Sequence, residues 1–565
     1  MKDKIVEELK DVYKAKSVIE INDMLGLKSV EDLEELQDSL RDLVSLGIVH
    51  ETKKGDFILI ENCKTLTVGS ISINKNGDGF LLRRNEPDIF VAQNQLNGAI
   101  NGDYVEVDVV NNEGQVIRIL KRDLKNIVGE IVSTKKGLAF KPDDEKLTIN
   151  IELTKDSLKG CVEGHKVLIN IVKELGNKRY LAEVKKVIGH KNDPGVDIIS
   201  IALRHGIEID FSPSTIKELE SIPDTVNEKE LNNRKDLTKE MIFTIDGDDT
   251  KDIDDAISIE KKEGLFELGV HIADVSNYVK VGSALYEDAY VRGTSSYLAD
   301  TVIPMIPHQL SNGICSLNEG VIRLTISCVM DIDYKGHIID YDIFPSYIKS
   351  NKKMTYKCVN KILEENEVPE GYEPFVDTLK TMQELASILR KEKISRGYIT
   401  FDIDEAKIIQ DENGKCIDVI KRYRGIGENL IEDFMIAANE TVAKLISNMD
   451  LPFIYRVHDI PNSDKIDEFV NLVKQLGYSI KTNLSKITPV TMRDLLEELK
   501  DKKEYPILSS MLLRSMKKAV YSTNNIGHFG LGSTNYTHFT SPIRRFPDLT
   551  VHRLLRTYLF ENNLD

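Results

Sequence analysis

The stretch 241–259 constrains this chain more than any other, because it places a dense cluster of acids between two apolar runs. The run that opens it and the run at 256–259 predict two buried strands. The six aspartates of 246–255 must then lie at the strand ends and in the loop between them. Residues 265–273 predict a third strand that pairs with the second. The fold must therefore accommodate concentrated negative charge at one end of neighbouring strands.

Such a cluster needs neutralisation. Two like charges 4 Å apart repel by about 4 kcal/mol at an effective dielectric near 20, so protons or divalent cations must compensate them. Oxygen ligands without nearby His or Cys favour Mg²⁺ or Mn²⁺ over Zn²⁺. Two Mg²⁺ ions held by aspartates are a common device for phosphodiester hydrolysis. We expect two Mg²⁺ ions, with Mn²⁺ as a substitute, and the candidate ligands are Asp246, Asp252, Asp254 and Asp255.

Two other interpretations of this stretch stay open. Acidic runs are often solvated surface loops with no ligand at all. A calcium site is a weaker alternative, because the EF-hand spacing D-x-[DN]-x-[DN]-G is absent.

The 565 residues exceed one ordinary core, and we expect several domains. Helical spacing of leucines in residues 1–62, followed by a short hairpin pattern, predicts a winged-helix-like module. A plain helical cap without a binding role is an equal alternative. A DNA-binding regulator that uses this module is a further hypothesis, and it rests on these residues alone.

An internal repeat follows. Val68-Gly69-Ser70-Ile71 recurs sixty residues on as Val128-Gly129-Glu130-Ile131. Short alternating runs broken by Gly, Asn and Asp predict two OB-fold, cold-shock-like barrels at 63–125 and 126–190. In such barrels exposed aromatics stack on single-stranded bases, and Phe80 and Phe90 are the candidates. The alternative is that both are ordinary core residues.

Residues 191–240 are polar and predict a connector, and 241–565 predict a large mixed α/β domain. The whole is thus multidomain α+β. No run of residues is apolar and long enough to predict a membrane span. The six scattered cysteines form no C-x-x-C and suit a reducing cytoplasm. We expect a cytoplasmic monomer with no membrane partner.

The net charge of −17 by itself argues against a nucleic-acid partner. The charge is uneven, however, because residues 505–556 hold seven lysines and arginines against a single acid. Within them, the pair Arg544-Arg545 follows a Ser-Pro turn and has the chemistry to clamp a phosphate. A bare arginine pair is more often only a surface feature.

Six motifs together carry a resemblance. They are TIDGDDTKDIDDA (244–256), HIADVSNYV (271–279), RGTSSYLADTVIPMIPHQLSN (292–312), GYITFDIDEAKI (397–408), LIEDFMIAANE (430–440) and HFGLGSTNYTHFTSPIRRFPDLTVHR (528–553). In this order they resemble the ribonuclease R / ribonuclease II family of 3′→5′ exoribonucleases, with ribonuclease R the more similar branch. The likeness covers the whole chain and implies an RNB-type catalytic domain.

The resemblance implies roles for individual residues. The four aspartates match the catalytic set that holds two Mg²⁺ ions. Arg544 matches the arginine that orients the scissile phosphate, and Tyr297 the tyrosine that clamps the 3′ end. Phe401 matches an aromatic that stacks on terminal bases, and Glu432 a glutamate near the 3′ nucleotide. Arg545 is either a further RNA contact or a structural ion-pair partner.

Two departures from the family pattern stand out. Phe546 takes the place of a usual Tyr, for which we expect a small effect. The sequence ends at Asp565, where the family normally continues into an S1 barrel, often with a lysine-rich tail. We expect a form without the S1 domain, with altered RNA capture that depends more on salt.

The function expected from all this is a processive, Mg²⁺-dependent, hydrolytic 3′→5′ exoribonuclease. It would degrade single-stranded RNA with a free 3′ end, and structured RNA as well, to nucleoside 5′-monophosphates. The alternative is a non-catalytic RNA-binding protein with a truncated nuclease fold. The complete aspartate set argues against that alternative.

Overall fold

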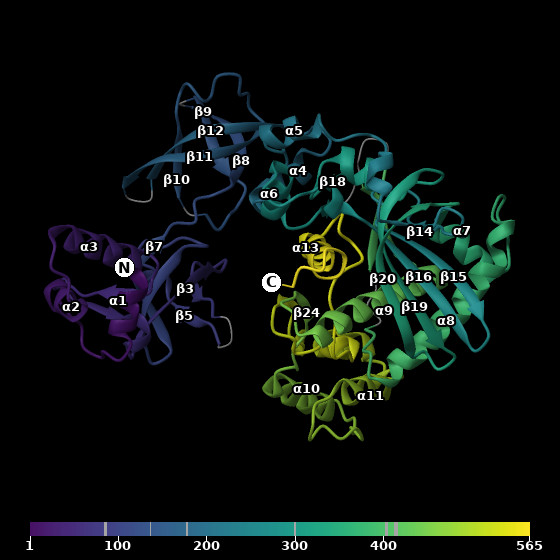
Figure 1. Ribbon diagram of the computed structural model, residues 1–565. Coiled ribbons are helices and arrows are strands. Elements are labelled where there is room, and N and C mark those ends of the chain that lie inside the picture. Colours follow the sequence, from purple (N-terminus) through teal and green to yellow (C-terminus); the bar gives the residue numbers. More distant parts are fainter. Residues whose placement is uncertain are drawn as a thin grey trace. The chain divides into compact units, whose positions relative to one another are not determined.

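The chain divides into two units, Met1–Ile209 and Asp210–Asp565 (Figure 1). The computed structural model describes residues 1–83, 87–135, 137–147, 149–176, 179–298, 301–401, 405–411 and 416–564. Each unit has hydrophobic cores of its own, built from its own residues.

The first sixty residues form three helices and a hairpin, as the sequence predicts. The elements are α1 (Lys2–Leu9), α2 (Val18–Leu25), α3 (Val30–Ser45), β1 (Val49–Glu51) and β2 (Phe57–Leu59), with β1 and β2 antiparallel. The side chains of Ser17 and Ser29 accept hydrogen bonds from backbone amides of the first helical turn, so they cap α2 and α3. The winged-helix character of this module stays a prediction.

Five short strands then close into a barrel. They are β3 (Leu66–Ile73), β4 (Gly79–Leu81), β5 (Ile89–Val91), β6 (Tyr104–Val110) and β7 (Glu113–Lys121), in the order β3-β4-β5-β7-β6. Alternate side chains such as Leu81, Val91 and Val105 fill the interior. Phe80 and Phe90 point the other way, because the side chains of a strand alternate between its two faces.

A second five-stranded sheet follows. Its strands are β8 (Ile127–Thr134), β9 (Gly137–Pro142), β10 (Asn150–Leu153), β11 (His165–Gly176) and β12 (Arg179–His190), in the order β10-β12-β11-β8-β9. The end strands β9 and β10 approach each other. Helix α4 (Val196–Arg204) packs Leu203 against Val128 and Leu168 of this sheet. The first part of the predicted connector therefore belongs to the N-terminal unit.

The second unit is built on another five-stranded sheet. Its strands are β13 (Lys235–Asp236), β15 (Asp255–Lys262), β16 (Leu265–Ala273), β19 (Ile322–Asp333) and β20 (Ile338–Lys349), in the order β13-β20-β19-β16-β15. Strand β15 pairs antiparallel with β16, which places Asp255 opposite Ile272. This confirms the pairing that the apolar runs predict.

One face of this sheet is apolar and the other is partly polar. Leu268, Val270 and Ile272 alternate along β16 into the largest core, against which α8 (Val376–Ser395) and α9 (Ile426–Met449) pack. On the opposite face the imidazole of buried His271 lies within hydrogen-bond distance of the hydroxyls of Ser258 and Ser327. The alternation of apolar and polar residues along β16 therefore determines which face of the sheet α8 and α9 cover.

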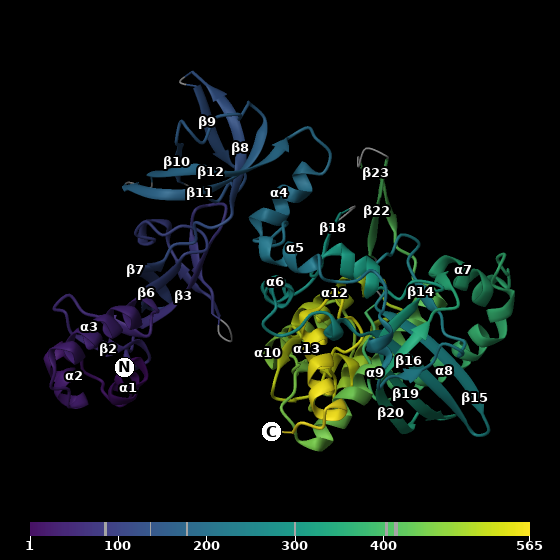
Figure 2. The same ribbon diagram turned by 45° about the horizontal axis from the view of Figure 1, so that its top comes forward.

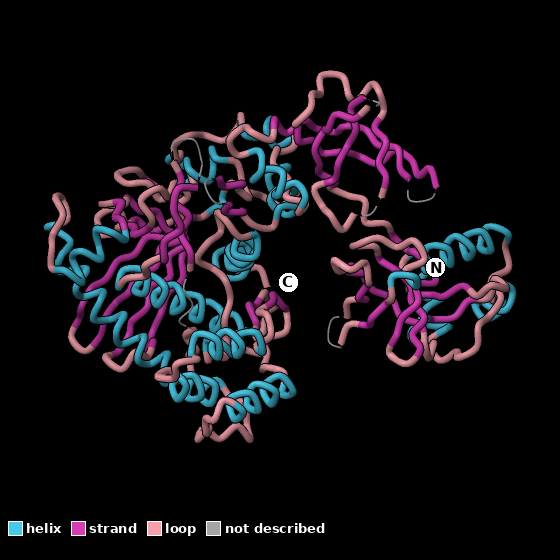
Figure 3. Tube along the Cα trace, turned by 180° about the vertical axis from the view of Figure 1, so that it is seen from behind, coloured by secondary structure: helices cyan, strands magenta, loops and turns pink. Residues whose placement is uncertain are grey.

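The second unit contains further helices, drawn in cyan with those of the first unit in Figure 3. They are α5 (Pro213–Leu219), α6 (Ala284–Arg292), α7 (Tyr356–Asn360), α10 (Ser463–Gln475), α11 (Pro489–Leu499), α12 (Tyr505–Ser515) and α13 (Phe546–Leu555). Helices α10 to α12 pack around a separate small core. Among the described residues, no helix has both the length and the apolar composition to cross a membrane.

In the described part of the second unit, four small strand pairs accompany the large sheet. They are β14 (Thr244–Asp246) with β21 (Lys353–Thr355), β17 (Ser296–Leu298) with β18 (Thr301–Ile303), β22 (Ala406–Gln410) with β23 (Cys416–Lys421), and β24 (Tyr455–Val457) with β25 (Val520–Ser522). The β22–β23 ribbon stands out from the body of its unit in Figure 2. The pair β14–β21 is parallel and carries the first aspartate of the acidic stretch to its end.

The apolar face of β16 should dominate the stability of the second unit. We expect Leu268→Ala to lower its free energy of unfolding by about 2–5 kcal/mol, because the fully buried side chain leaves a cavity. Ile339→Ala, at an exposed position of β20, should cost less than about 0.5 kcal/mol. Denaturant titration followed by circular dichroism measures both, and equal losses would contradict this assignment of the core.

Candidate active site

Four of the aspartates are set in place by two strands and the loop between them. Asp246 is the last residue of β14, and Asp255 is the first of β15. Within the loop, Ile253 is buried and its backbone amide donates to the hydroxyl of Ser316. Apolar anchors on both sides thus force the charged side chains toward one place.

That place is a cavity of about 900 Å³ in the second unit. It is lined by eight of the predicted site residues: Asp246, Asp252, Asp254, Asp255, Tyr297, Glu432, Arg544 and Arg545. They come from strands, loops and helices spread over 300 residues of sequence. The structure therefore gathers in one cavity what the sequence predicts as one site.

Burial perturbs the carboxyl groups strongly. It raises the pKa of Asp254 to about 8, although Arg544 and the amide of Ile543 oppose the rise. It raises the pKa of Asp255 to about 7, and the charge of Asp246 adds to this effect. The pKa of Asp246 is also raised, chiefly by burial. The site thus holds acids that need a positive partner to stay ionised at neutral pH.

Arg544 supplies part of that positive charge. Its Nε donates to Oδ2 of Asp254 at 3.3 Å, and its Nη2 donates to the hydroxyl of Ser541 at 2.9 Å. The amide of Ile543 donates to the other oxygen of Asp254 at 2.8 Å. The turn Ser541–Arg544 is therefore held against the aspartate loop by both oxygens of one carboxylate. Burial alone would lower the pKa of Arg544, but the neighbouring acids outweigh burial and raise it.

Arg545 has a different partner, although it also borders the cavity. Its Nη2 donates to Oδ1 of fully buried Asp548 at 2.8 Å, within the first turn of α13. The same carboxylate oxygen accepts from the amide of Ser541. This geometry favours the interpretation of Arg545 as a structural ion-pair partner, and its contact with RNA stays a prediction.

Tyr297 lies on β17 with its hydroxyl turned to the aspartates. It donates to Oδ2 of Asp252 at 2.5 Å, yet about half of the residue is exposed. Burial of the hydroxyl end and the carboxylate partner raise its pKa well above the usual range. Next to this strand, Ser295 donates its amide to the carbonyl of Arg544. Tyr297 and Arg544 are thereby fixed in one backbone frame.

Glu432, on α9, accepts hydrogen bonds from Tyr398 at 2.7 Å and from Arg424 at 3.0 Å. Buried Lys393 lies 3.3 Å from it. Burial alone would raise the pKa of Glu432, but these partners outweigh burial and lower it. Glu432 is therefore an ionised acceptor at the cavity wall.

Tyr398 also lines the cavity, and sequence reasoning missed it. It lies three residues before Phe401 in the same motif, which offers two aromatics and no sign of which one faces the site. Phe401 is not among the cavity-lining residues; its side chain packs on the core of α10–α12. The stacking role of Phe401 stays a prediction.

The N-terminal unit carries the other aromatic candidates. Phe80 on β4 and Phe90 on β5 are directly opposite each other, and their rings meet edge to face at 5.7 Å. Neither belongs to the barrel core, and Phe90 is exposed. This favours the exposed aromatic pair over the alternative of two core residues.

The aspartates fit a hard divalent cation in their chemistry. All are oxygen donors, and no His or Cys lines the described wall of the cavity. Asp246 uses one carboxylate oxygen for Gly247 and Thr250, which leaves the other uncommitted, and no hydrogen bond of the Asp255 side chain is found within the described ranges. Over those same ranges, no three carboxylates, imidazoles or thiols lie at ion-binding distance of one another.

Comparison with known families agrees with this fold and site. The RNB domain model matches residues 234–561, the Ribonuclease B OB domain model residues 69–119, and the Cold shock domain model residues 140–212. The RNB match spans more than half of the chain and contains the whole cavity. Fold and site thus define an RNB-domain nuclease with OB and cold-shock domains, which confirms the predicted fold class apart from its winged-helix-like start.

Individual similar proteins narrow the assignment from RNB-domain nucleases to one family. Ribonuclease R of Thermotoga maritima is 43% identical over 98% of this chain and 79% of its own length. The structure of Mycoplasma genitalium RNase R in complex with ribose methylated single-stranded RNA superposes with a TM-score of 0.83 at 30% identity, over 88% of this chain and 80% of that one. Its complex with double-stranded RNA gives 0.77 at 32%, over 82% and 81%. This chain belongs to the ribonuclease R family of 3′→5′ exoribonucleases.

The two neighbouring arginines should respond differently to substitution. We expect Arg545→Gln to lower the free energy of unfolding by about 3 kcal/mol, because it leaves the buried Asp548 without a charge partner. Arg544→Gln should cost clearly less, because nearly half of the Arg544 side chain is exposed and Asp254 can take up a proton. Thermal and denaturant unfolding of both variants test this, and a larger loss in Arg544→Gln would contradict it.

Proposed function

We propose that this protein is a processive, divalent-metal-dependent, hydrolytic 3′→5′ exoribonuclease that releases nucleoside 5′-monophosphates. The observation that carries the proposal is the convergence of Asp246, Asp252, Asp254, Asp255 and Arg544 on one cavity. Anionic acceptors beside a fixed guanidinium suit phosphodiester chemistry, where charge develops on the phosphoryl oxygens. An RNA-binding groove without chemistry would have no use for buried, mutually repelling acids.

The reaction follows from these positions. Water attacks the phosphorus of the last phosphodiester, and the bond to the 3′ oxygen of the preceding nucleotide breaks. That oxygen takes a proton, and the terminal nucleotide leaves as a 5′-monophosphate. Arg544 stabilises the negative charge that grows on the phosphate, and Asp254 holds its guanidinium in place. The shortened RNA keeps a 3′-hydroxyl, so the cycle can repeat without release.

Asp246, Asp252 and Asp255 are the residues that would hold divalent cations, with Asp254 as the fourth member of the set. When bound there, such ions supply charge neutralisation and Lewis-acid polarisation of the phosphate. Mg²⁺ is the proposed ion and Mn²⁺ a substitute, because the donors are all oxygen.

The 3′ end is bound by groups beside the acids. Tyr297 presents an exposed ring for stacking, and Glu432 offers an ionised acceptor for a ribose hydroxyl. Stacking tolerates every base, which gives weak sequence preference. A hydroxyl contact distinguishes RNA from DNA. The Phe80–Phe90 pair provides a similar stacking surface for single-stranded RNA in the N-terminal unit.

Structured RNA is a second proposed substrate, supported by the relative that was solved with double-stranded RNA. The proposed compartment is the cytoplasm. All six cysteines are free, and Cys161, Cys315 and Cys328 are buried, which suits a reducing environment.

A time course on 5′-labelled single-stranded RNA tests the activity. We expect a ladder that shortens from the 3′ end with Mg²⁺ and no cleavage in EDTA. Arg544→Ala should lower kcat about 10²- to 10³-fold through lost charge stabilisation. Asp254→Asn should bind RNA without cutting it. Wild type that binds RNA but leaves it intact with both Mg²⁺ and Mn²⁺ would make the non-catalytic RNA-binding alternative the better one.

Metal binding should depend on pH through the buried acids. Their folded-state pKa values, about 8 for Asp254 and about 7 for Asp255, exceed the unfolded value of about 4. In ion-free protein their protonation therefore favours the folded state at low pH, and this stability is lost as pH rises through 7 to 8. Mg²⁺ competes with these protons, so it should raise the melting temperature more at about pH 8.5 than at about pH 6.

Two variants control this measurement. Asp255→Asn should abolish most of the Mg²⁺-dependent rise in melting temperature, since it removes one proposed ligand. Asp340→Asn, at an exposed position of β20, should keep the wild-type response. An equal Mg²⁺-dependent rise in melting temperature at both pH values would contradict the proposed ion site.

A further inference from the structure

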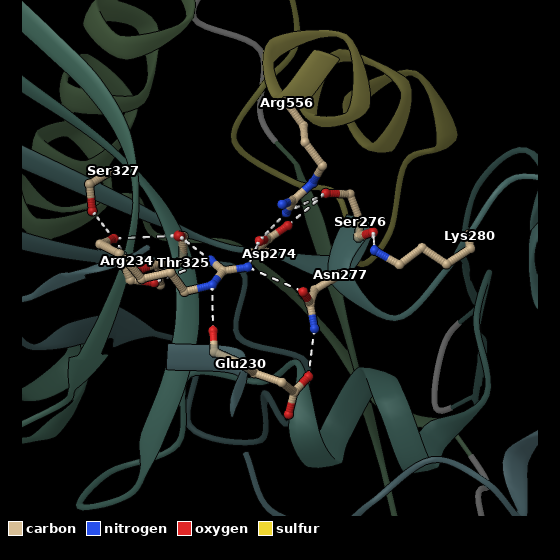
Figure 4. A network of polar contacts seen from close by, with 10 residues as sticks. Glu230, Arg234, Asp274, Ser276, Asn277, Lys280, Thr325, Ser327 and Arg556 are labelled. Atoms are coloured by element: carbon tan, nitrogen blue, oxygen red, sulfur yellow. Dashed lines mark hydrogen bonds and ion pairs between the residues drawn. The ribbon is translucent and has the colours of Figure 1, made fainter. Parts of the chain in front are cut away.

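Another buried carboxylate, that of Asp274, lies just beyond the end of β16, and a polar network surrounds it (Figure 4). Its Oδ2 accepts from Nη2 of Arg234 at 2.6 Å and from Nη2 of Arg556 at 2.5 Å. Its Oδ1 accepts from the hydroxyl of Ser276 at 2.6 Å. The side chain is fully buried and none of the predicted roles covers it.

The two arginines come from opposite ends of the unit's sequence. Arg234 also donates to the carbonyls of Thr325 and Ser346, so it is fixed to β19 and β20. Arg556 follows α13 directly and is the only link of that helix end to this carboxylate among the described residues. Asp274 therefore joins the central sheet to the C-terminal end of α13.

The charge state of Asp274 supports a strong link between the sheet and α13. Burial alone would raise the pKa of Asp274, but Arg556 and Arg234 outweigh burial and hold it well below its usual range. The carboxylate is therefore ionised at neutral pH and forms charge-assisted hydrogen bonds to both guanidinium groups. Such bonds are directional, whereas the apolar contacts of Val551 and Leu555 fix only the distance of the helix from the core.

The same helix carries Arg544 at its other end. Arg545 is the N-cap of α13, and the turn before it is bound to Asp254. Asp254 lies at the same end of the β15–β16 pair as Asp274, because the amide of Ala273 donates to the carbonyl of Asp254 at 2.9 Å. Two carboxylates at one sheet end thus hold the two ends of one helix, which is about 15 Å long.

We propose that Asp274 is a positioning residue for Arg544: it fixes the C-terminal end of α13 and thereby the angle at which the Arg544 guanidinium enters the cavity beside Asp254. The proposal rests on the proposed function, because its readout is RNA cleavage. Loss of the Asp274 charge leaves Arg234 and Arg556 facing each other without a counterion, and the helix end moves away. The aspartates and the surfaces that bind RNA are left unchanged.

Asp274→Asn is the first variant to measure. We expect kcat on single-stranded RNA to fall about 10- to 100-fold, as misplacement of a catalytic group does. KM, and RNA binding in EDTA, should stay within about threefold of wild type, because no binding group is removed. Should Asp274→Asn fail to fold, Arg556→Gln takes its place, since Arg556 is partly exposed and its loss leaves Asp274 paired with Arg234.

A double-mutant cycle with Arg544→Lys separates positioning from general destabilisation. If Asp274 acts through Arg544, its substitution in the Arg544→Lys background should cost less than about threefold in kcat. Glu440→Gln is the matched control, because Glu440 pairs with Arg396 between α9 and α8 in the same unit and does not line the active-site cavity. Glu440→Gln should lower kcat only slightly, and by the same factor in the wild-type and in the Arg544→Lys background.

The outcomes are distinct. Coupling between Asp274 or Arg556 and Arg544, with KM unchanged, supports the proposal. Independent multiplication of the two effects, a loss seen mainly in KM, or wild-type kcat in Asp274→Asn overturns it while the nuclease function stands. A wild-type protein that does not cleave RNA overturns the proposed function and this inference together.

Discussion

The contact between Asp254 and the turn Ile543–Arg544 is the interaction on which the site depends. It joins a loop near the middle of the chain to a turn almost 300 residues later, through one amide and one guanidinium. Without it, the aspartates would be a repelling acidic loop and the arginine a surface cation. With it, negative and positive groups share one cavity, as phosphodiester chemistry requires.

A second contact of a buried carboxylate with a distant arginine lies nearby in the same unit. At the same end of the β15–β16 pair, Asp254 faces Arg544 and Asp274 faces Arg556. The two acids nevertheless differ in charge state: burial outweighs its single guanidinium at Asp254 and raises the pKa, whereas two guanidinium groups at Asp274 lower it. One acid is thus open to exchange a proton or meet an ion, and the other is a permanent anchor. The second guanidinium at Asp274 and the neighbouring acids Asp255 and Asp548 at Asp254 both contribute to this difference.

Much of the fold follows from local patterns. Alternation of apolar residues predicts β15 and β16 and their pairing, and leucine spacing predicts the N-terminal helices, because both are set by the backbone's own periods. The aspartates are equally visible, since four acids in one loop cannot be compensated locally. The place of Tyr398 could not be found this way. Which of two nearby aromatics faces a cavity depends on packing between distant elements.

The sequence by itself determined the chemical inventory: the oxygen donors, the arginine pair, the two candidate aromatics of the first barrel, and the family to which the order of the motifs belongs. Only the tertiary structure decided which role each of these residues has. It placed Arg544 against Asp254, and it made Asp274 an anchor between Arg234 and Arg556. The physical reason is that charge state and accessibility depend on burial and on partners far away in sequence, which no local pattern encodes.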